Sequence, residues 1–261
     1  MFKLRRGQLS QVFLRSPELA RKLIGRSSIG KSDLVLEIGP GTGLLTSPLL
    51  RAAKRVIAIE RDPDLHRALQ QQFCHYKNLR LVCADFLQFQ LPQEPYKVLA
   101  NIPFAIEGRV IRKLIDAPNP PEDCYLVMRK EVAERLAGIT RDGQFSILHK
   151  PWFEFEIVHR FERSDFIPKP KVESVMLRFV KRTSPLLPKQ ERSRFRQFII
   201  IGFGGGRRVR QNLSNIFSPH QLRTLSRELK FSPDAKPSDL SFSQWLSLYR
   251  SKDRVCYNSA Q

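Results

Sequence analysis

Several residue types and patterns are scarce in this chain of 261 amino acids. It has two tryptophans and four cysteines, and no apolar run approaches the length of a transmembrane helix. The cysteines (Cys74, Cys83, Cys124 and Cys256) form no Cys-x-x-Cys pair, which disfavours a zinc site. No apolar signal-peptide core follows the basic N-terminus, so a disulfide framework is not expected either. We therefore expect a cytoplasmic protein in a reducing compartment, with no metal and no membrane segment.

Acidic residues are also scarce, since 25 Asp and Glu face 45 Lys and Arg, a formal net charge of +20. Residues 1–30 carry seven basic residues and one acidic residue, and residues 181–261 carry 16 and five. Residues 31–180 carry 22 and 19 and are nearly neutral. Two basic flanks favour a polyanion as partner, bound with a steep dependence on salt. A well-hydrated basic surface is the alternative, and a membrane surface is disfavoured.

Strand and helix patterns alternate from about residue 30 to residue 130. Continuous apolar strands that alternate with helices indicate a buried parallel sheet, hence an α/β fold. Two later extended runs need not be parallel to the others. The strands are expected at 34–38, 56–59, 79–84, 98–100, 124–128, 153–157 and 172–180, and the helices at 44–53, 63–76, 108–115 and from 131.

A proline-rich stretch at residues 183–188 marks a boundary. Beyond it the pattern is helical, with Phe195, Phe198, Ile199 and Phe203 at helical spacing. We therefore predict two domains. Residues 1–182 would form the catalytic, cofactor-binding domain, with a basic segment at 1–30, and residues 183–261 would form a small all-helical RNA-binding domain.

The fourth predicted strand ends in Asn101-Ile102-Pro103-Phe104. The exocyclic amine of an adenine is a poor nucleophile, because its lone pair is delocalised into the ring. Two acceptors, the Asn101 side-chain oxygen and the Ile102 carbonyl, would hold the protons of that amine and direct its lone pair. Pro103 biases Ile102 toward extended geometry, and Phe104 offers a face for a base to stack on. The corner predicts methylation of an adenine amine, and a plain proline turn is the alternative.

A glycine-rich loop, Glu37-Ile38-Gly39-Pro40-Gly41-Thr42-Gly43, follows the first predicted strand. Such loops can approach a ligand closely, although many are structural turns, and the spacing differs from the G-x-G-x-x-G dinucleotide fingerprint. Glu60 ends the second strand and suits ribose hydroxyls, and Asp85 follows the third and suits an adenine amine. Each acid alone is more often a solvated strand end. With Asn101 they all fall at carboxyl ends of strands, which predicts a site for S-adenosylmethionine.

The chain resembles the ribosomal RNA adenine N6-methyltransferases, which include the Erm resistance enzymes and the KsgA-type dimethyladenosine transferases. Residues 7–14, 37–43 and 101–104 carry the resemblance, with the Phe-x-Pro-x-Pro-x-Val-x-Ser motif at 166–174. It implies a Rossmann-like class I methyltransferase sheet that binds S-adenosylmethionine, with Phe166 over the target base. The cofactor contacts that it and the loop imply are Gln11, Leu14, Glu37, Gly39, Gly41, Glu60, Asp85 and Asn101.

Local differences suggest the branch within that family. Residues 151–159 and Ile102 resemble Erm proteins, and residues 140–145 lack the pattern typical of the KsgA branch, whereas residues 207–213 are similar to a KsgA segment. We therefore expect methylation of large-subunit (23S) rRNA by a monomer, with resistance to macrolide-lincosamide-streptogramin B antibiotics as a consequence. The alternatives are a small-subunit (16S) dimethyladenosine transferase, a DNA adenine methyltransferase, and an inactive RNA-binding assembly factor.

The basic flanks and the lysines near the base pocket are expected to contact the RNA. An exposed helix face is the alternative reading for the three arginines beyond residue 200. Direct methyl transfer needs no metal and no strong general base, so the five histidines are expected to be structural or on the surface. The predicted RNA contacts are Arg5, Arg6, Lys169, Lys171, Arg207, Arg208 and Arg210.

Overall fold

The computed structural model describes residues 12–257, and the chain folds as two compact units. One unit ends at Ala133 and also takes in Glu154–Lys181. The other comprises Glu134–Phe153 and the chain from Arg182. The second unit therefore includes sequence that precedes the proline-rich stretch. The predicted assignment of functions to residues 1–182 and 183–261 stays a prediction.

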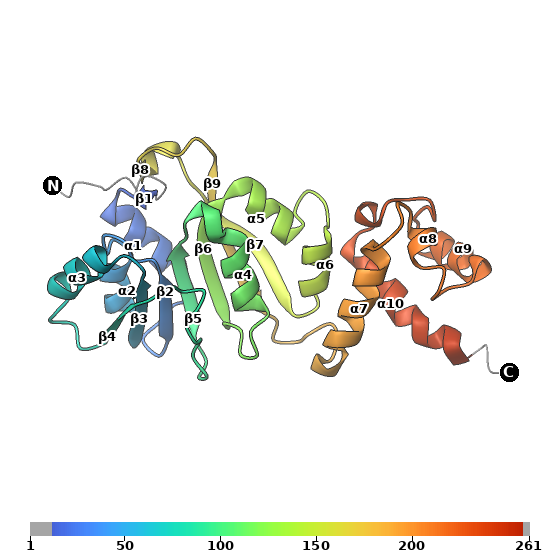
Figure 1. Ribbon diagram of the computed structural model, residues 1–261, viewed down its shortest axis with the longest axis horizontal. Helices are drawn as coiled ribbons and strands as arrows, with labels where there is room; N and C mark the ends of the chain where they lie inside the picture. The colour runs from blue at the N-terminus through green and yellow to red at the C-terminus, as the bar shows by residue number, and fades with distance from the viewer. Residues whose placement is uncertain (1–11, 258–261) are drawn as a thin grey trace. The chain divides into compact units, whose positions relative to one another are not determined.

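A seven-stranded sheet with the order β4-β3-β2-β5-β6-β9-β7 forms the centre of the first unit (Figure 1). β2 is parallel to both β3 and β5, and β6 is antiparallel to β9. The predicted α/β fold with a mainly parallel sheet is confirmed. A second, antiparallel pair joins β1 (Phe13–Leu14) to β8 (Phe166–Ile167). The strands of the large sheet are β2 Leu34–Ile38, β3 Arg55–Glu60, β4 Leu79–Cys83, β5 Lys97–Asn101, β6 Asp123–Arg129, β7 Phe153–Arg160 and β9 Ser174–Lys181.

Helices cover both faces of this sheet, which explains why its central strands are buried and largely apolar. The chain crosses from β2 to β3 and β4 in one direction and from β5 to β6 in the other, so right-handed connections place α4 on the face opposite α2 and α3. On the α1–α3 face, Val35, Val56 and Leu99 belong to one apolar core with residues of those helices. The helices are α1 Pro17–Gly25, α2 Thr46–Ala52, α3 Pro63–Gln72, α4 Glu107–Ile115 and α5 Lys130–Ala137.

The helix ends follow local chemistry. The Ser16 hydroxyl accepts from the Leu19 N–H at 3.2 Å and caps α1, and Asp62 caps α3 in the same way. The helix predicted over 63–76 ends at Gln72, because Phe73 turns its buried ring against Gly43. None of the helices within residues 12–257 is long and apolar enough to cross a membrane.

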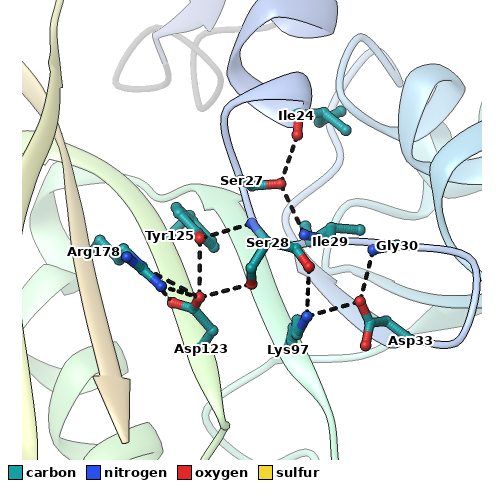
Figure 2. Close-up of polar contacts among 10 residues, drawn as sticks. All are labelled: Ile24, Ser27, Ser28, Ile29, Gly30, Asp33, Lys97, Asp123, Tyr125 and Arg178. Carbon is teal, nitrogen blue, oxygen red and sulfur yellow. Dashed lines mark hydrogen bonds and ion pairs between the residues drawn. The ribbon is translucent and has the colours of Figure 1, made fainter.

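A polar network links the amino ends of β5 and β6 to Arg178 of β9 (Figure 2). Asp123, at the start of β6, accepts from Arg178 Nη2 (2.7 Å), the Tyr125 hydroxyl (2.9 Å) and the Ser28 hydroxyl (2.7 Å). Lys97 of β5 donates to the Ser28 carbonyl at 2.6 Å. Arg178 Nε also donates to Asp123 Oδ1 at 3.0 Å, so both oxygens of this carboxylate, which is 3% exposed, are hydrogen-bonded. The network joins the α1–β2 connection to β5, β6 and β9.

The second unit is helical around an aromatic core, as predicted for the C-terminal segment. Tyr249 of α10 packs edge-to-face against Phe195 and Phe198 of α7, with ring centroids 5.0 and 5.5 Å apart. Gly202 lets α7 approach the Trp245 indole, since a Cβ there would lie 2.4 Å from the ring. The helices of this unit are α6 Gln144–His149, α7 Arg192–Phe203, α8 Val209–Asn212, α9 Pro219–Glu228 and α10 Phe242–Tyr257.

Candidate active site

A cavity of about 590 Å³, part of it open to solvent, lies at the carboxyl ends of β2, β3 and β5. The chain reverses its direction across the sheet at β2, and open α/β sheets bind ligands in the crevice at such a point. The glycine loop, β1 and the corner after β5 form its walls. The lining residues are Val12, Phe13, Leu14, Gly39, Pro40, Gly41, Thr42, Leu44, Leu45, Glu60, Asn101, Ile102, Pro103 and Phe104.

The loop after β2 needs its glycines. Gly39, Gly41 and Gly43 have φ of +65°, +59° and +81°, a region that other residues rarely adopt. A Cβ at Gly41 would lie 2.7 Å from the Phe13 ring of β1, and a Cβ at Gly43 would lie 2.5 Å from the Phe73 ring. The loop therefore packs closely against two aromatic rings and presents backbone to the cavity.

Glu60 places a buried carboxylate in the cavity wall. Its side chain accepts from the Gly41 N–H at 3.0 Å through Oε2 and from the Asp62 N–H at 2.9 Å through Oε1. Glu60 is only 3% exposed. The two bonds fix the orientation of the carboxylate, and each oxygen keeps a lone pair for a further donor such as a hydroxyl.

Glu37 lies in the middle of the sheet beside this loop and is fully buried. Neither of its oxygens makes a hydrogen bond within the described residues, and the buried Thr46 hydroxyl makes none there either. Burial raises the pKa of Glu37 to about 8; the nearby Thr46 hydroxyl opposes this increase, and the charge of Glu60 adds to it. Glu37 does not line the cavity.

The corner after β5 brings Asn101 and Ile102 to the cavity. The Asn101 Nδ2 donates to the Val12 carbonyl at 2.6 Å, across 89 positions of sequence. This bond fixes the carboxamide and leaves its oxygen as the end available to a ligand. Within residues 12–257, no hydrogen bond to the Ile102 carbonyl is found. Asn101 and Ile102, each of which carries an acceptor oxygen, thus both line the cavity.

Phe104 supplies an aromatic face to the same cavity. The guanidinium carbon of Arg129 lies 6.0 Å from the centroid of the Phe104 ring. Arg129 is itself held by Glu107, whose Oε2 accepts from Arg129 Nε at 2.9 Å. The sequence analysis missed Glu107 and Arg129, because charged residues at a helix start and a strand end are common and carry no distinctive spacing.

These groups fit S-adenosylmethionine. The glycine loop lets the backbone approach a nucleoside, and the Glu60 carboxylate suits ribose hydroxyls. The Glu60 carboxylate also suits a ligand that carries positive charge. No cluster of three His, Cys, Asp or Glu suited to a metal ion is present among the described residues.

Besides Glu37, two more of the predicted catalytic and cofactor-binding residues do not line the cavity. Asp85 follows β4 and uses its side chain to accept from the Leu87 N–H at 2.9 Å, closing a turn. Phe166 of β8 is 2% exposed and packs against Phe161, with centroids 5.2 Å apart. Its pairing with Leu14 places Phe166 in the core, so this arrangement brings only Phe104 of the two predicted rings to the cavity. Gln11 lies outside the described residues.

The predicted RNA contacts differ in their surroundings. Lys169 and Lys171 are exposed between β8 and β9. Arg207 is exposed in the second unit, whereas Arg208 and Arg210 both pair with Asp234, at 2.8 and 2.5 Å. Hydrogen bonding to Arg208, with the charge of both arginines, lowers the pKa of Asp234. Arg5 and Arg6 lie outside the described residues.

A comparison with known proteins identifies the family of this chain. The profile of a family described as "Ribosomal RNA adenine dimethylase" matches residues 2–254. The chain belongs to this family. It is therefore an rRNA adenine methyltransferase, and the resemblance stated from the sequence motifs is confirmed.

Named relatives favour one branch of the family. "Ribosomal RNA small subunit methyltransferase A" of Nostoc punctiforme is 36% identical over 236 residues, which cover 84% of this chain and 82% of the relative. The protein of the same name from Acaryochloris marina is 35% identical over 257 residues, 93% of this chain and 95% of the relative. The expectation of the Erm branch is not supported by these relatives, nor is the associated antibiotic resistance.

Solved structures confirm the Rossmann-like methyltransferase fold. The crystal structure of the 23S rRNA methyltransferase ErmE has a TM-score of 0.84 at 28% identity, covering 92% of this chain and 99% of ErmE. A dimethyladenosine transferase from Plasmodium falciparum has a TM-score of 0.72 at 25% identity, covering 92% and 98%. Both branches therefore share this fold, so similarity of structure does not choose the RNA target.

Proposed function

We propose that this protein transfers methyl groups from S-adenosylmethionine to N6 of adenine in small-subunit (16S) rRNA. The observation that carries the chemistry is the Asn101 carboxamide, which is fixed by its bond to Val12 and lines the cavity together with Ile102. The names of the relatives support the small-subunit target.

Asn101 and Ile102 would act on the amine of the target base. Each acceptor would receive a hydrogen bond from one N–H of the amine, so the nitrogen lone pair would turn out of the ring plane toward the methyl donor. Because the Asn101 donor is already bonded to Val12, the side chain presents an acceptor without reorganisation during the reaction. The amine becomes acidic only as the new bond forms, so no strong base is required.

The remaining walls would hold the two substrates. S-adenosylmethionine, when bound, supplies a methyl group already activated by the sulfonium. Gly39, Gly41 and Glu60 would hold its nucleoside, and Asp85 and Gln11 stay predicted contacts. Phe104 would stack on the adenine after the base leaves its helix, and contact with Phe166 would require that ring to be uncovered.

Asn101→Ala tests the proposal. We expect methyl transfer to fall by roughly 10²–10³-fold, because one acceptor for the developing charge is lost. Binding of S-adenosylmethionine and RNA should persist. Binding titrations would measure this beside a transfer assay, and undiminished transfer by the variant would contradict the mechanism.

A large-subunit target is the second candidate, which the Erm-like residues 151–159 and Ile102 favour. Purified protein would be incubated with 16S rRNA, with small subunits and with 23S rRNA, and the methylated nucleotide mapped in each. Modification of 16S rRNA or small subunits alone supports the proposal, whereas modification of 23S rRNA alone would overturn the choice of target. Binding without transfer to any RNA would support the inactive assembly factor.

A further inference from the structure

The hydrogen-bond ladder between β5 and β6 stops at the catalytic corner. Its last pair is Asn101 with Val127, and the Ile102 N–H still donates to the Val127 carbonyl at 3.3 Å. In a parallel ladder, the residue whose N–H donates to one carbonyl of the neighbouring strand accepts, through its own carbonyl, from an N–H of that same strand. This N–H belongs to the residue two positions after the one that provided the carbonyl. The natural donor to the Ile102 carbonyl is therefore the N–H of Arg129.

Arg129 gives that N–H to another acceptor. It donates to Glu107 Oε1 at 2.7 Å, and its Nε donates to Glu107 Oε2 at 2.9 Å. Glu107 is 1% exposed and is the first residue of α4, where the partial positive charge of the helix end favours a carboxylate. The side chain of Glu107 thus takes the ladder position that the Ile102 carbonyl would otherwise fill.

We propose that Glu107 is a positioning residue that keeps the Ile102 carbonyl available to the substrate amine, an inference that rests on the proposed function. A carbonyl that already accepts a strong backbone bond holds a second donor less well. With Arg129 diverted, the oxygen of Ile102 keeps its acceptor capacity for the amine.

The same pair steadies the stacking ring. The Arg129 guanidinium lies by the face of Phe104, and its Nη2 donates to the Phe104 carbonyl at 3.4 Å. Glu107 therefore acts on the two groups that would hold the adenine. It acts on the Ile102 carbonyl through the backbone N–H of Arg129, and on the Phe104 ring through the Arg129 side chain. Glu107 itself does not line the cavity.

Two substitutions separate this role from plain structural support. Glu107→Met fills similar space without an acceptor, so the Arg129 N–H can return to Ile102. Glu107→Gln keeps a carbonyl oxygen for that N–H and loses the charge. We expect Glu107→Met to lower kcat roughly tenfold or more at saturating substrates, with S-adenosylmethionine affinity unchanged. Glu107→Gln should stay within a few-fold of wild type.

Glu94→Gln is the control, since Glu94 forms an exposed ion pair with Arg55 at the amino end of β3, whereas the corner follows the carboxyl end of β5. Wild-type kcat in Glu107→Met, or an equal loss in Glu107→Gln, would overturn the proposal. A wild-type protein that transfers no methyl group to any RNA would instead count against the proposed function.

A measurement on the unmodified protein tests the diversion without any variant. Scalar coupling across hydrogen bonds, read by nuclear magnetic resonance on labelled protein, reports which carbonyl each N–H meets. We expect no coupling between the Arg129 nitrogen and the Ile102 carbonyl carbon, and a coupling from that nitrogen to the Glu107 carboxyl carbon. A coupling to Ile102 would refute the inference, whether or not Glu107→Met folds.

Discussion

Glu37 and Glu60 are two buried carboxyl groups beside one loop, and their surroundings differ. Glu60 receives two backbone N–H bonds, whereas Glu37 receives none within the described residues. An unpartnered carboxyl in an apolar environment favours its neutral form, which is why the pKa of Glu37 is raised to about 8. One residue can therefore make the stability of the whole unit depend on pH.

The sign of that dependence follows from proton binding. In the unfolded chain Glu37 ionises near its ordinary pKa of 4.5, while the folded protein keeps its proton up to about pH 8. The folded state therefore binds the extra proton between these values, and stability falls as pH rises through that range. Glu37→Gln removes this contribution, so the variant should gain stability relative to wild type from pH 5 to pH 8. Urea unfolding at several pH values would check this, and parallel curves for the two proteins would contradict it.

The sequence predicts some site residues because their positions are fixed by the sheet. Asn101, Glu60 and the glycine loop each follow a strand, and parallel strands bring their carboxyl ends to one edge. The bond between Asn101 and Val12 and the diversion of Arg129 by Glu107 are not predictable in this way. They depend on where two distant segments meet, which no local pattern encodes.

At the scale of elements, the network around Asp123 joins three strands to the α1–β2 connection (Figure 2). Arg178 Nη2 lies 2.7 Å from Asp123, with side-chain exposures of 29% and 4%, so this pair is far better shielded than Arg55 and Glu94. Removing one partner of a buried pair leaves the other without compensation.

Asp123→Asn should therefore destabilise the protein by about 3 kcal/mol, since the amide cannot accept from all its present donors. Glu94→Gln, which breaks the exposed pair with Arg55, should cost less than about 1 kcal/mol. Chemical unfolding of both variants measures the difference. Equal effects would show that the network adds no more than a surface ion pair.

The pairing of β1 with β8 sets where the Phe166 ring lies, and the contact of that ring with the target base stays a prediction. The motif at 166–174 suggests a ring over the target base, whereas the ladder with Leu14 directs that ring into the core. Two-residue strands carry too little pattern to be predicted, so their effect on Phe166 was not foreseeable from the sequence.

At the scale of the whole chain, the net charge of +20 is the dominant feature. Ion pairs within the protein decide how much of this positive charge is available to bind RNA. Arg208 and Arg210 share Asp234, so part of the predicted RNA contact is neutralised within the protein. RNA binding by the remaining lysines and arginines should weaken steeply as salt concentration rises.

Asp234→Asn should release both arginines, raise RNA affinity several-fold at low salt and steepen the salt dependence. Asp239→Asn is a matched control, because it removes one exposed acid of the same unit that pairs with Arg141. Titrations with 16S rRNA fragments over a range of salt would compare the two. Identical behaviour would show that Arg208 and Arg210 do not contact RNA.

The branch of the family is also a property of the whole chain. The features used to favour Erm, Ile102 and residues 151–159, are a few positions among many. Full-length similarity to small-subunit enzymes draws on the entire sequence and outweighs them. Short motifs here identify the reaction, because its chemistry needs those groups, but do not identify the RNA.

The short β1–β8 ladder has a mechanical consequence. Phe13 covers the glycine loop, and its ladder partner Ile167 begins the segment that carries Lys169 and Lys171. Phe13 lines the cavity, so one short ladder joins a wall of the cavity to the segment that carries the two lysines. If RNA contacts those lysines as predicted, a shift of their segment would also move the Phe13 ring against the glycine loop.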